Sequence, residues 1–208
     1  EALPVYSIAV ERGDWAAALA DARQVDAALE AERAKRPVYG LMQRVWIWPL
    51  EALAMARTGD QAGAQALIGK TPLDCYQCLR VRGQVAGSAK DWAGADRWFA
   101  EAVRQAPTPS FAYAEWAEVR LARGDTDGAV RLAKSAAVKA PRFADPVETW
   151  GEALMAKGDA AGAAERFAAA DKLAPHWGAN HLRWAQALAK LGKADEARAQ
   201  RAAAVRFR

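Results

Sequence analysis

The stretch ADPVETWGEALMAKGDAAGAAERFAAADKLAP, from Ala144 to Pro175, decides the fold. Two runs with apolar residues at helical spacing flank the tripeptide Lys157-Gly158-Asp159. Glycine can take the left-handed conformation that ends a helix, and aspartate can accept backbone N–H groups at the start of the next one. Pro175 ends the second run, because proline cannot continue a helix. The stretch therefore predicts a helix-turn-helix unit.

This unit repeats along the second half of the chain at an interval of 34 residues. Four kinds of residue keep the interval: Pro107, Pro141 and Pro175; Gly124, Gly158 and Gly192; Trp116, Trp150 and Trp184; and Ala95, Ala129, Ala163 and Ala197. Agreement among four residue types is not an accident of composition. A fixed period of this length is typical of repeat architectures in which each unit stacks on its neighbours.

The order of residues within the unit resembles the tetratricopeptide repeat (TPR). A bulky–small pair, a turn glycine, a small residue, an aromatic residue, a second small residue and a closing proline follow one another as Trp150-Gly151, Gly158, Ala163, Phe167, Ala170 and Pro175. The resemblance implies an all-α, helical-hairpin repeat solenoid that winds into a right-handed superhelix. The first helix of each pair would then line its concave surface.

About six helix pairs are expected, and they would make residues 1–208 a single TPR-like domain. Residues 73–208 hold four regular 34-residue repeats, and residues 1–72 hold degenerate ones. In the degenerate part, Gly69 and Pro72 shorten a second helix, and Pro49 predicts a kink or a late helix start. In the last repeat Arg201 replaces the inward aromatic residue, as suits a terminal helix with no successor to cover it.

Composition favours a folded chain and says little about chemistry. Of the 208 residues, 52% are hydrophobic and 26% are charged, and the net charge is +4. No run approaches the roughly 18 apolar residues of a membrane span. Since no leader precedes Glu1, we expect a cytoplasmic location, although removal of a periplasmic signal peptide would leave the same start. The piece is interpreted as a sensing or docking part of a larger bacterial protein.

Motifs of catalysis are missing or incomplete. Gly69-Lys70-Thr71 resembles the end of a phosphate-binding loop, but Ala64 stands where that loop requires glycine, and no strand precedes it. The chain has no dinucleotide fingerprint, no His-Glu-x-x-His and no nucleophile elbow. We therefore expect a protein that is not an enzyme and that carries neither a cofactor nor a metal.

Cys75 and Cys78 form a Cys-x-x-Cys at the expected start of a helix. Three interpretations remain open. The two are structural thiols, a redox-active or disulfide-forming pair, or half of a zinc site; structural thiols are favoured because neither a thioredoxin-like strand nor a second cysteine pair is present. A thiol-based redox switch within a larger signalling protein is the alternative function.

The resemblance also implies which stripe of each first helix faces the groove. Taken at spacing i, i+3, i+7 and i+10, the candidate partner-binding residues are Gln77, Arg80, Gln84, Phe111, Glu118, Asp145, Glu148, Glu152, Met155 and Gln186. This stripe is acidic in the fifth pair although the chain is basic overall. We therefore expect a noncatalytic scaffold that binds a basic or amphipathic peptide or protein, with no nucleic acid, since an RNA-binding repeat array would need a basic inner face. The sequence leaves the oligomeric state open.

Overall fold

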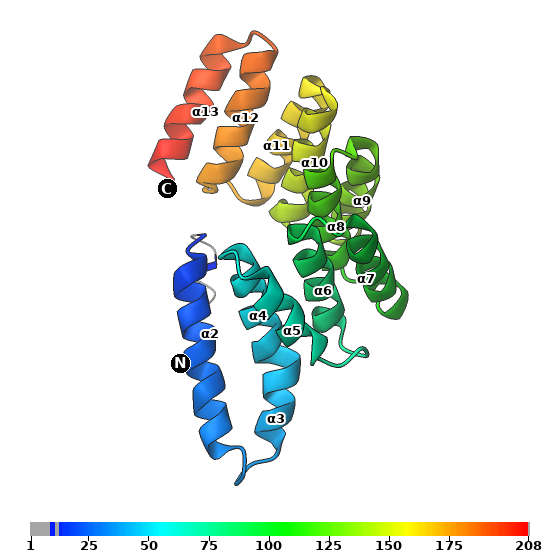
Figure 1. Cartoon of the computed structure of the whole chain (residues 1–208). Coiled ribbons are helices and arrows are strands. Elements are labelled where there is room, and N and C mark those ends of the chain that lie inside the picture. The colour runs from blue at the N-terminus through cyan, green and yellow to red at the C-terminus, as the bar shows by residue number, and fades with distance from the viewer. Residues whose placement is uncertain (1–8, 11–12, 208) are drawn as a thin grey trace. The chain divides into compact units, whose positions relative to one another are not determined.

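The computed structural model describes Ala9, Val10 and residues 13–207, and every regular element in that part of the chain is helical (Figure 1). Helices pair with their neighbours as antiparallel hairpins, which confirms the predicted all-α, TPR-like fold. None of the described helices is both long enough and apolar enough to cross a membrane.

The chain divides into two compact units, residues 1–107 and 108–208. The first contains α2 (Trp15–Glu32), α3 (Val38–Met42), the π-helix η1 (Gln43–Ile47), α4 (Trp48–Arg57), α5 (Gln61–Gly69), α6 (Tyr76–Ser88) and α7 (Trp92–Gln105). The second contains α8 (Phe111–Arg123), α9 (Thr126–Lys139), α10 (Ala144–Lys157), α11 (Ala160–Leu173), α12 (Gly178–Lys190) and α13 (Ala194–Arg206). The unit boundary follows Pro107, the closing proline of a repeat, whereas residue 72 marks a change in repeat regularity.

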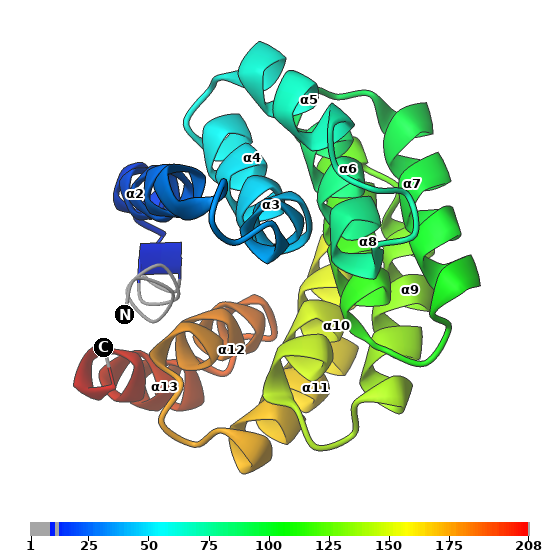
Figure 2. The same ribbon diagram turned by 90° about the horizontal axis from the view of Figure 1, so that it is seen from below.

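Five of the six expected pairs lie within the described residues: α3-η1-α4 with α5, α6 with α7, α8 with α9, α10 with α11, and α12 with α13. The first helix of the remaining pair falls largely on residues outside the described part, and its second helix is α2. Within the C-terminal unit, α10 contacts both α8 and α12, so three first helices follow one another side by side (Figure 2). The predicted superhelical path and single domain stay predictions.

In four hairpins the turn combines a left-handed residue with an aspartate cap on α5, α7, α9 or α11, whereas the turn before α13 has Gly192 followed by Lys193 and no side-chain cap. Gly158 adopts a φ of 92°, and the carboxylate of Asp159 accepts the backbone N–H of Gly162 at 2.8 Å. The turn between α6 and α7 differs from the other three in having no left-handed glycine, because Lys90 takes the left-handed conformation at a φ of 60°. A β-carbon makes that conformation costly, so Lys90 is a strained variant of the repeat turn.

Two of the regular hairpins, α6–α7 and α10–α11, close around an aromatic side chain that meets a glycine. Phe167 of α11 and Phe99 of α7 are fully buried, and their rings cover Gly151 of α10 and Gly83 of α6. Since glycine has no side chain, the two helices approach closely enough for the ring to fill the space between them. This packing explains the bulky–small pair of the sequence repeat.

The disturbance expected at Pro49 is a π-helical turn. In η1 the Trp48 N–H donates to the carbonyl of Gln43, five residues back, and α4 begins with Pro49 in its first turn. Proline has no N–H, so it cannot serve the carbonyl of Val45, four residues earlier. The Arg44 carbonyl loses its α-helical donor too, because that donor, Trp48 N–H, is given to Gln43. A π turn therefore accommodates the proline without ending the helical segment.

Candidate partner-binding surfaces

The C-terminal unit holds a pocket of about 720 Å³ between α8, α10 and the α9–α10 loop. Two aromatic side chains stand at it with large exposed fractions, Phe111 at 58% and Phe143 at 63%. Pro141 and Pro146 add rigid apolar walls. Exposed aromatic residues at a concave surface are typical of a site that receives an apolar side chain from a partner.

Charged groups of both signs line this pocket. Glu115, Glu118 and Asp145 supply carboxylates, and Lys139 and Arg142 supply cations. Lys139 is engaged over the Tyr113 ring, with 4.8 Å between its Nζ and the ring centroid. The structure thus brings three candidates from the sequence, Phe111, Glu118 and Asp145, to one pocket. Three charged residues that the stripe did not include, Glu115, Lys139 and Arg142, line it as well.

Glu148 is buried, and its environment differs from the open acidic face expected of the groove. Its side chain lies against Arg183 of α12, with 2.8 Å between a guanidinium nitrogen and Oε1, and Arg183 also pairs with Glu152. Burial, as the main cause, and the neighbouring Glu152 carboxylate together raise the pKa of Glu148 to about 8, against the opposing effect of Arg183. The acidic stripe of α10 is therefore largely internal to the α10–α12 contact.

The other two candidates of the C-terminal unit, Met155 and Gln186, lie away from this pocket. Met155 packs against the cluster formed by Ala163, Phe167 and Ala187, so it belongs to the core. Gln186 is exposed on α12. Neither residue lines the aromatic pocket.

The remaining candidates, Gln77, Arg80 and Gln84, lie on α6 in the N-terminal unit. All three are half-buried, and the Arg80 guanidinium lies 5.4 Å from the centroid of the Tyr76 ring. Gln77 lines a second pocket of about 720 Å³, together with Cys75 and Trp46. Each unit therefore has its own concave surface.

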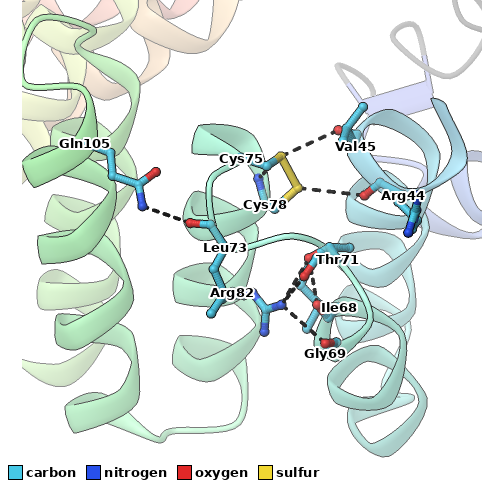
Figure 3. Close-up of a disulfide and its surroundings, with 10 residues drawn as sticks. All are labelled: Arg44, Val45, Ile68, Gly69, Thr71, Leu73, Cys75, Cys78, Arg82 and Gln105. Carbon is cyan, nitrogen blue, oxygen red and sulfur yellow. Dashed lines mark hydrogen bonds between the residues drawn. A yellow bond between two sulfur atoms is a disulfide. The ribbon is translucent and has the colours of Figure 1, made fainter. Parts of the chain in front are cut away.

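Cys75 and Cys78 are joined by a disulfide and do not stand as separate thiols (Figure 3). Cys75 is the N-cap of α6, and its Sγ accepts the backbone N–H of Cys78 at 3.2 Å. The metal interpretation finds no support in the described residues, where no three His, Cys, Asp or Glu side chains gather in a ligand cluster.

The Gly69-Lys70-Thr71 stretch ends a helix. Gly69 is the last residue of α5, and the carbonyls of Gly69 and Thr71 accept hydrogen bonds from the Arg82 guanidinium (Figure 3). A phosphate-binding loop instead offers backbone N–H groups at a helix N-terminus. The loop thus presents acceptors to a cation, which agrees with the sequence argument against nucleotide binding.

Sequence reasoning missed four residues that shape these surfaces or the contacts beside them. The α9–α10 loop residues Arg142 and Phe143 carried a signal, since they place a cation and an aromatic ring directly after a closing proline. Arg183 carried none, because its reach to Glu148 depends on how α12 is rotated against α10. The exposed Trp46 beside the disulfide depends on the π turn of η1.

These features define the class as a TPR-like array of helical hairpins. No family model matches the chain, and no curated protein matches it. Among solved structures, the chain is similar to a crystal structure of MamA, with a TM-score of 0.61 and 17% identity over 74% of this chain and 91% of that one. A MamA structure from Desulfovibrio magneticus RS-1 gives a TM-score of 0.63 and 14% identity over 79% of this chain and 94% of that one. These likenesses support the fold.

Proposed function

We propose that the chain is a noncatalytic interaction scaffold whose C-terminal unit binds a basic, amphipathic peptide segment. The observation that carries the proposal is the aromatic pocket of α8, α10 and the α9–α10 loop. Its exposed rings, Phe111 and Phe143, would receive an apolar side chain of the peptide.

The carboxylates of the pocket favour a peptide with positive charge. Glu115, Glu118 and Asp145 line the pocket, and Asp145 and Glu118 are exposed. Lysine or arginine side chains of the peptide would pair with these carboxylates, which favours the encounter and fixes the orientation. Exposed Arg142 lines the same pocket and would repel a peptide cation placed beside it, which would help to set the direction of the peptide.

A binding assay with two matched double variants tests the proposal. The probe is a fluorescein-labelled helical peptide with leucine and lysine on opposite faces, titrated by fluorescence anisotropy. Glu118→Gln with Asp145→Asn removes two pocket carboxylates and should weaken binding by about fivefold or more, as for charged groups in an interface. The control, Asp127→Asn with Glu165→Gln, removes two exposed carboxylates from α9 and α11, including one at the same helical position as Asp145.

Phe143→Ala tests the apolar contribution to binding. It should weaken binding of the peptide and leave the dependence of the affinity on salt concentration unchanged. Equal losses in the pocket and control variants would show that the peptide responds to overall charge and would overturn the proposal. Helicity of every variant is checked by circular dichroism. Glu148 is unsuitable for this purpose, because a lysine there would be buried beside Arg183.

A further inference from the structure

A second surface, in the N-terminal unit, surrounds the Cys75–Cys78 disulfide. Cys75 lines the pocket of about 720 Å³ that also receives Leu41, Trp46 and Tyr76. Leu41 and Trp46 are 51% and 57% exposed, so the pocket has apolar walls that face solvent. Three charged residues, Arg44, Lys70 and Asp74, line the same pocket.

The two sulfurs differ in access. Cys75 is half-buried and reaches the pocket, whereas Cys78 has an exposed fraction of 0% and does not line it. An incoming thiolate can therefore reach only the sulfur of Cys75. This division into an accessible and a shielded sulfur is what a thiol–disulfide exchange site requires.

The surroundings of Cys75 would also stabilise its thiolate in the reduced pair. At the N-cap of α6, a Cys75 thiolate would keep the backbone N–H of Cys78 that its sulfur already accepts, and it would face the positive end of the helix. Cations of Arg44 and Lys70 at the pocket favour the thiolate, and Asp74 opposes them.

Cys78 has a ready acceptor for its proton. Its Sγ lies 3.8 Å from the carbonyl oxygen of Arg44, and the Sγ of Cys75 lies 3.9 Å from that of Val45 (Figure 3). A disulfide sulfur has no proton to donate, whereas a Cys78 thiol could donate to the Arg44 carbonyl, which the π turn and Pro49 leave without its α-helical donor. Reduction would thus give this carbonyl a hydrogen bond that the disulfide cannot supply.

We infer that Cys75 and Cys78 form a thiol–disulfide exchange site, with Cys75 as the exchanging sulfur, Cys78 as the resolving sulfur and a cysteine thiol of a peptide as the co-reactant. In the reducing direction, a peptide thiolate attacks Cys75 Sγ, the Cys75–Cys78 bond breaks, and its electron pair leaves on Cys78, which takes a proton from solvent. A second peptide thiolate then attacks the peptide sulfur of the mixed disulfide and releases Cys75 as a thiolate. The protein gains two electrons, and two peptide thiols become one disulfide.

The first experiment uses the unmodified chain, equilibrated over a series of reduced-to-oxidised glutathione ratios, quenched in acid and alkylated for mass spectrometry. A single reversible transition between the dithiol and the disulfide is expected. A pair that stays oxidised in a large excess of reduced glutathione would be a structural disulfide, and that result would overturn the inference.

The second experiment assigns the two roles. In Cys78→Ser, Cys75 should form a mixed disulfide with oxidised glutathione at least about fivefold faster in the folded protein than in urea, as a larger thiolate fraction predicts. In Cys75→Ser, which keeps a good N-cap at position 75, Cys78 should react more slowly in the folded protein than in urea. Equal rates for the two cysteines in the folded proteins would overturn the assignment. A cysteine peptide with flanking leucines, compared with glutathione in the same assay, shows whether the tripeptide or a longer chain is the faster co-reactant.

Failure of this inference is distinguishable from failure of the proposed function. The cysteines lie in the N-terminal unit, and the proposed peptide pocket lies in the C-terminal unit. Neither set of variants alters the residues on which the other proposal depends.

Discussion

The ring of Phe167 covers Gly151 so closely that a Cβ added to the glycine would stand 2.6 Å from Cε1 of the ring. Phe99 covers Gly83 in the same way, at 2.6 Å from Cε2. The aromatic residue of one helix therefore requires a glycine at the facing position of its partner helix. The recurrence of this contact in two hairpins, one in each compact unit, explains why the bulky–small pair and the aromatic position share one interval.

Replacing Gly151 by alanine should lower the free energy of unfolding by about 1–3 kcal/mol, because the methyl group overpacks a filled core. Urea denaturation followed by circular dichroism measures the change. Gly69→Ala is the matched control, since nothing lies within 4 Å of a Cβ at that helical position. It should be neutral or stabilise slightly through reduced backbone entropy, and equal losses in both variants would contradict the packing argument.

The strained turn at Lys90 predicts a variant with a higher free energy of unfolding, in contrast to Gly151→Ala. Lys90→Gly should raise the free energy of unfolding by up to about 1 kcal/mol, since the left-handed conformation costs a residue with a Cβ more than it costs glycine. The reciprocal variant, Gly158→Lys, places lysine at a φ of 92° and should destabilise by a similar amount. Thermal and urea unfolding of both variants should show that Lys90→Gly stabilises the protein and Gly158→Lys destabilises it. If both variants stabilised the protein, backbone strain would be excluded as the cause.

Glu148 predicts how stability changes with pH. Its pKa in the folded protein is raised to about 8, so the native state keeps a proton that the unfolded state releases near pH 4.5. Native Glu148 thus binds more protons than unfolded Glu148 between these values. Its contribution to stability is fully present below about pH 4.5 and is lost as pH rises toward 8.

Glu148→Gln should flatten this part of the pH dependence. Between pH 5 and 7.5 the wild-type free energy of unfolding should fall with pH more steeply than that of the variant, by up to about 1.4 kcal/mol per pH unit. Urea titrations at several pH values measure both slopes. Parallel slopes would show that Glu148 is ionised in the native state at neutral pH.

Arg82 predicts a loss of stability in the N-terminal unit. Its guanidinium donates to the carbonyls of Gly69 and Thr71 and lies 5.1 Å from the Trp98 ring centroid. Arg82→Met keeps the apolar stem but removes these donors, and should cost about 1.5–3 kcal/mol, as for hydrogen bonds to charged groups. Arg97→Met is the control, because exposed Arg97 also lies over Trp98, at 4.8 Å. It should change stability by less than about 0.5 kcal/mol; a loss equal to that of Arg82→Met would assign the effect to the ring.

The repeat register and the hairpin turns could be predicted from the sequence because both are local. Gly158 and Asp159 act within one turn, and the 34-residue interval carries the same contacts from hairpin to hairpin. The shortening of α5 by Gly69 and the disturbance at Pro49 were local in the same sense. The kind of disturbance was not predictable, because a π turn, a kink and a late start all relieve the missing N–H of proline.

The candidate surface was predicted only in part. Phe111 and Glu118 reach one pocket because helical spacing places them on one face of α8, and Asp145 of α10 lines the same pocket. Glu148 shares that spacing, yet its carboxylate is enclosed by Arg183 from a helix that begins 30 residues later in the sequence. Spacing within one helix cannot show which side chains a neighbouring helix will cover.

The Cys75–Cys78 bond closes a very short loop, with a sequence separation of 3. A cross-link restricts the unfolded chain according to the length of the loop that it closes, and a loop this small removes only about 2 kcal/mol of unfolded-chain entropy, against about 4.7 kcal/mol for a loop of about 100 residues. The bond therefore stabilises the fold less than a disulfide between distant residues would. The exchange that we infer for Cys75 and Cys78 would therefore change the oxidation state of the pair while the helical hairpins persist, and the two sulfurs would then report the redox state of the surroundings.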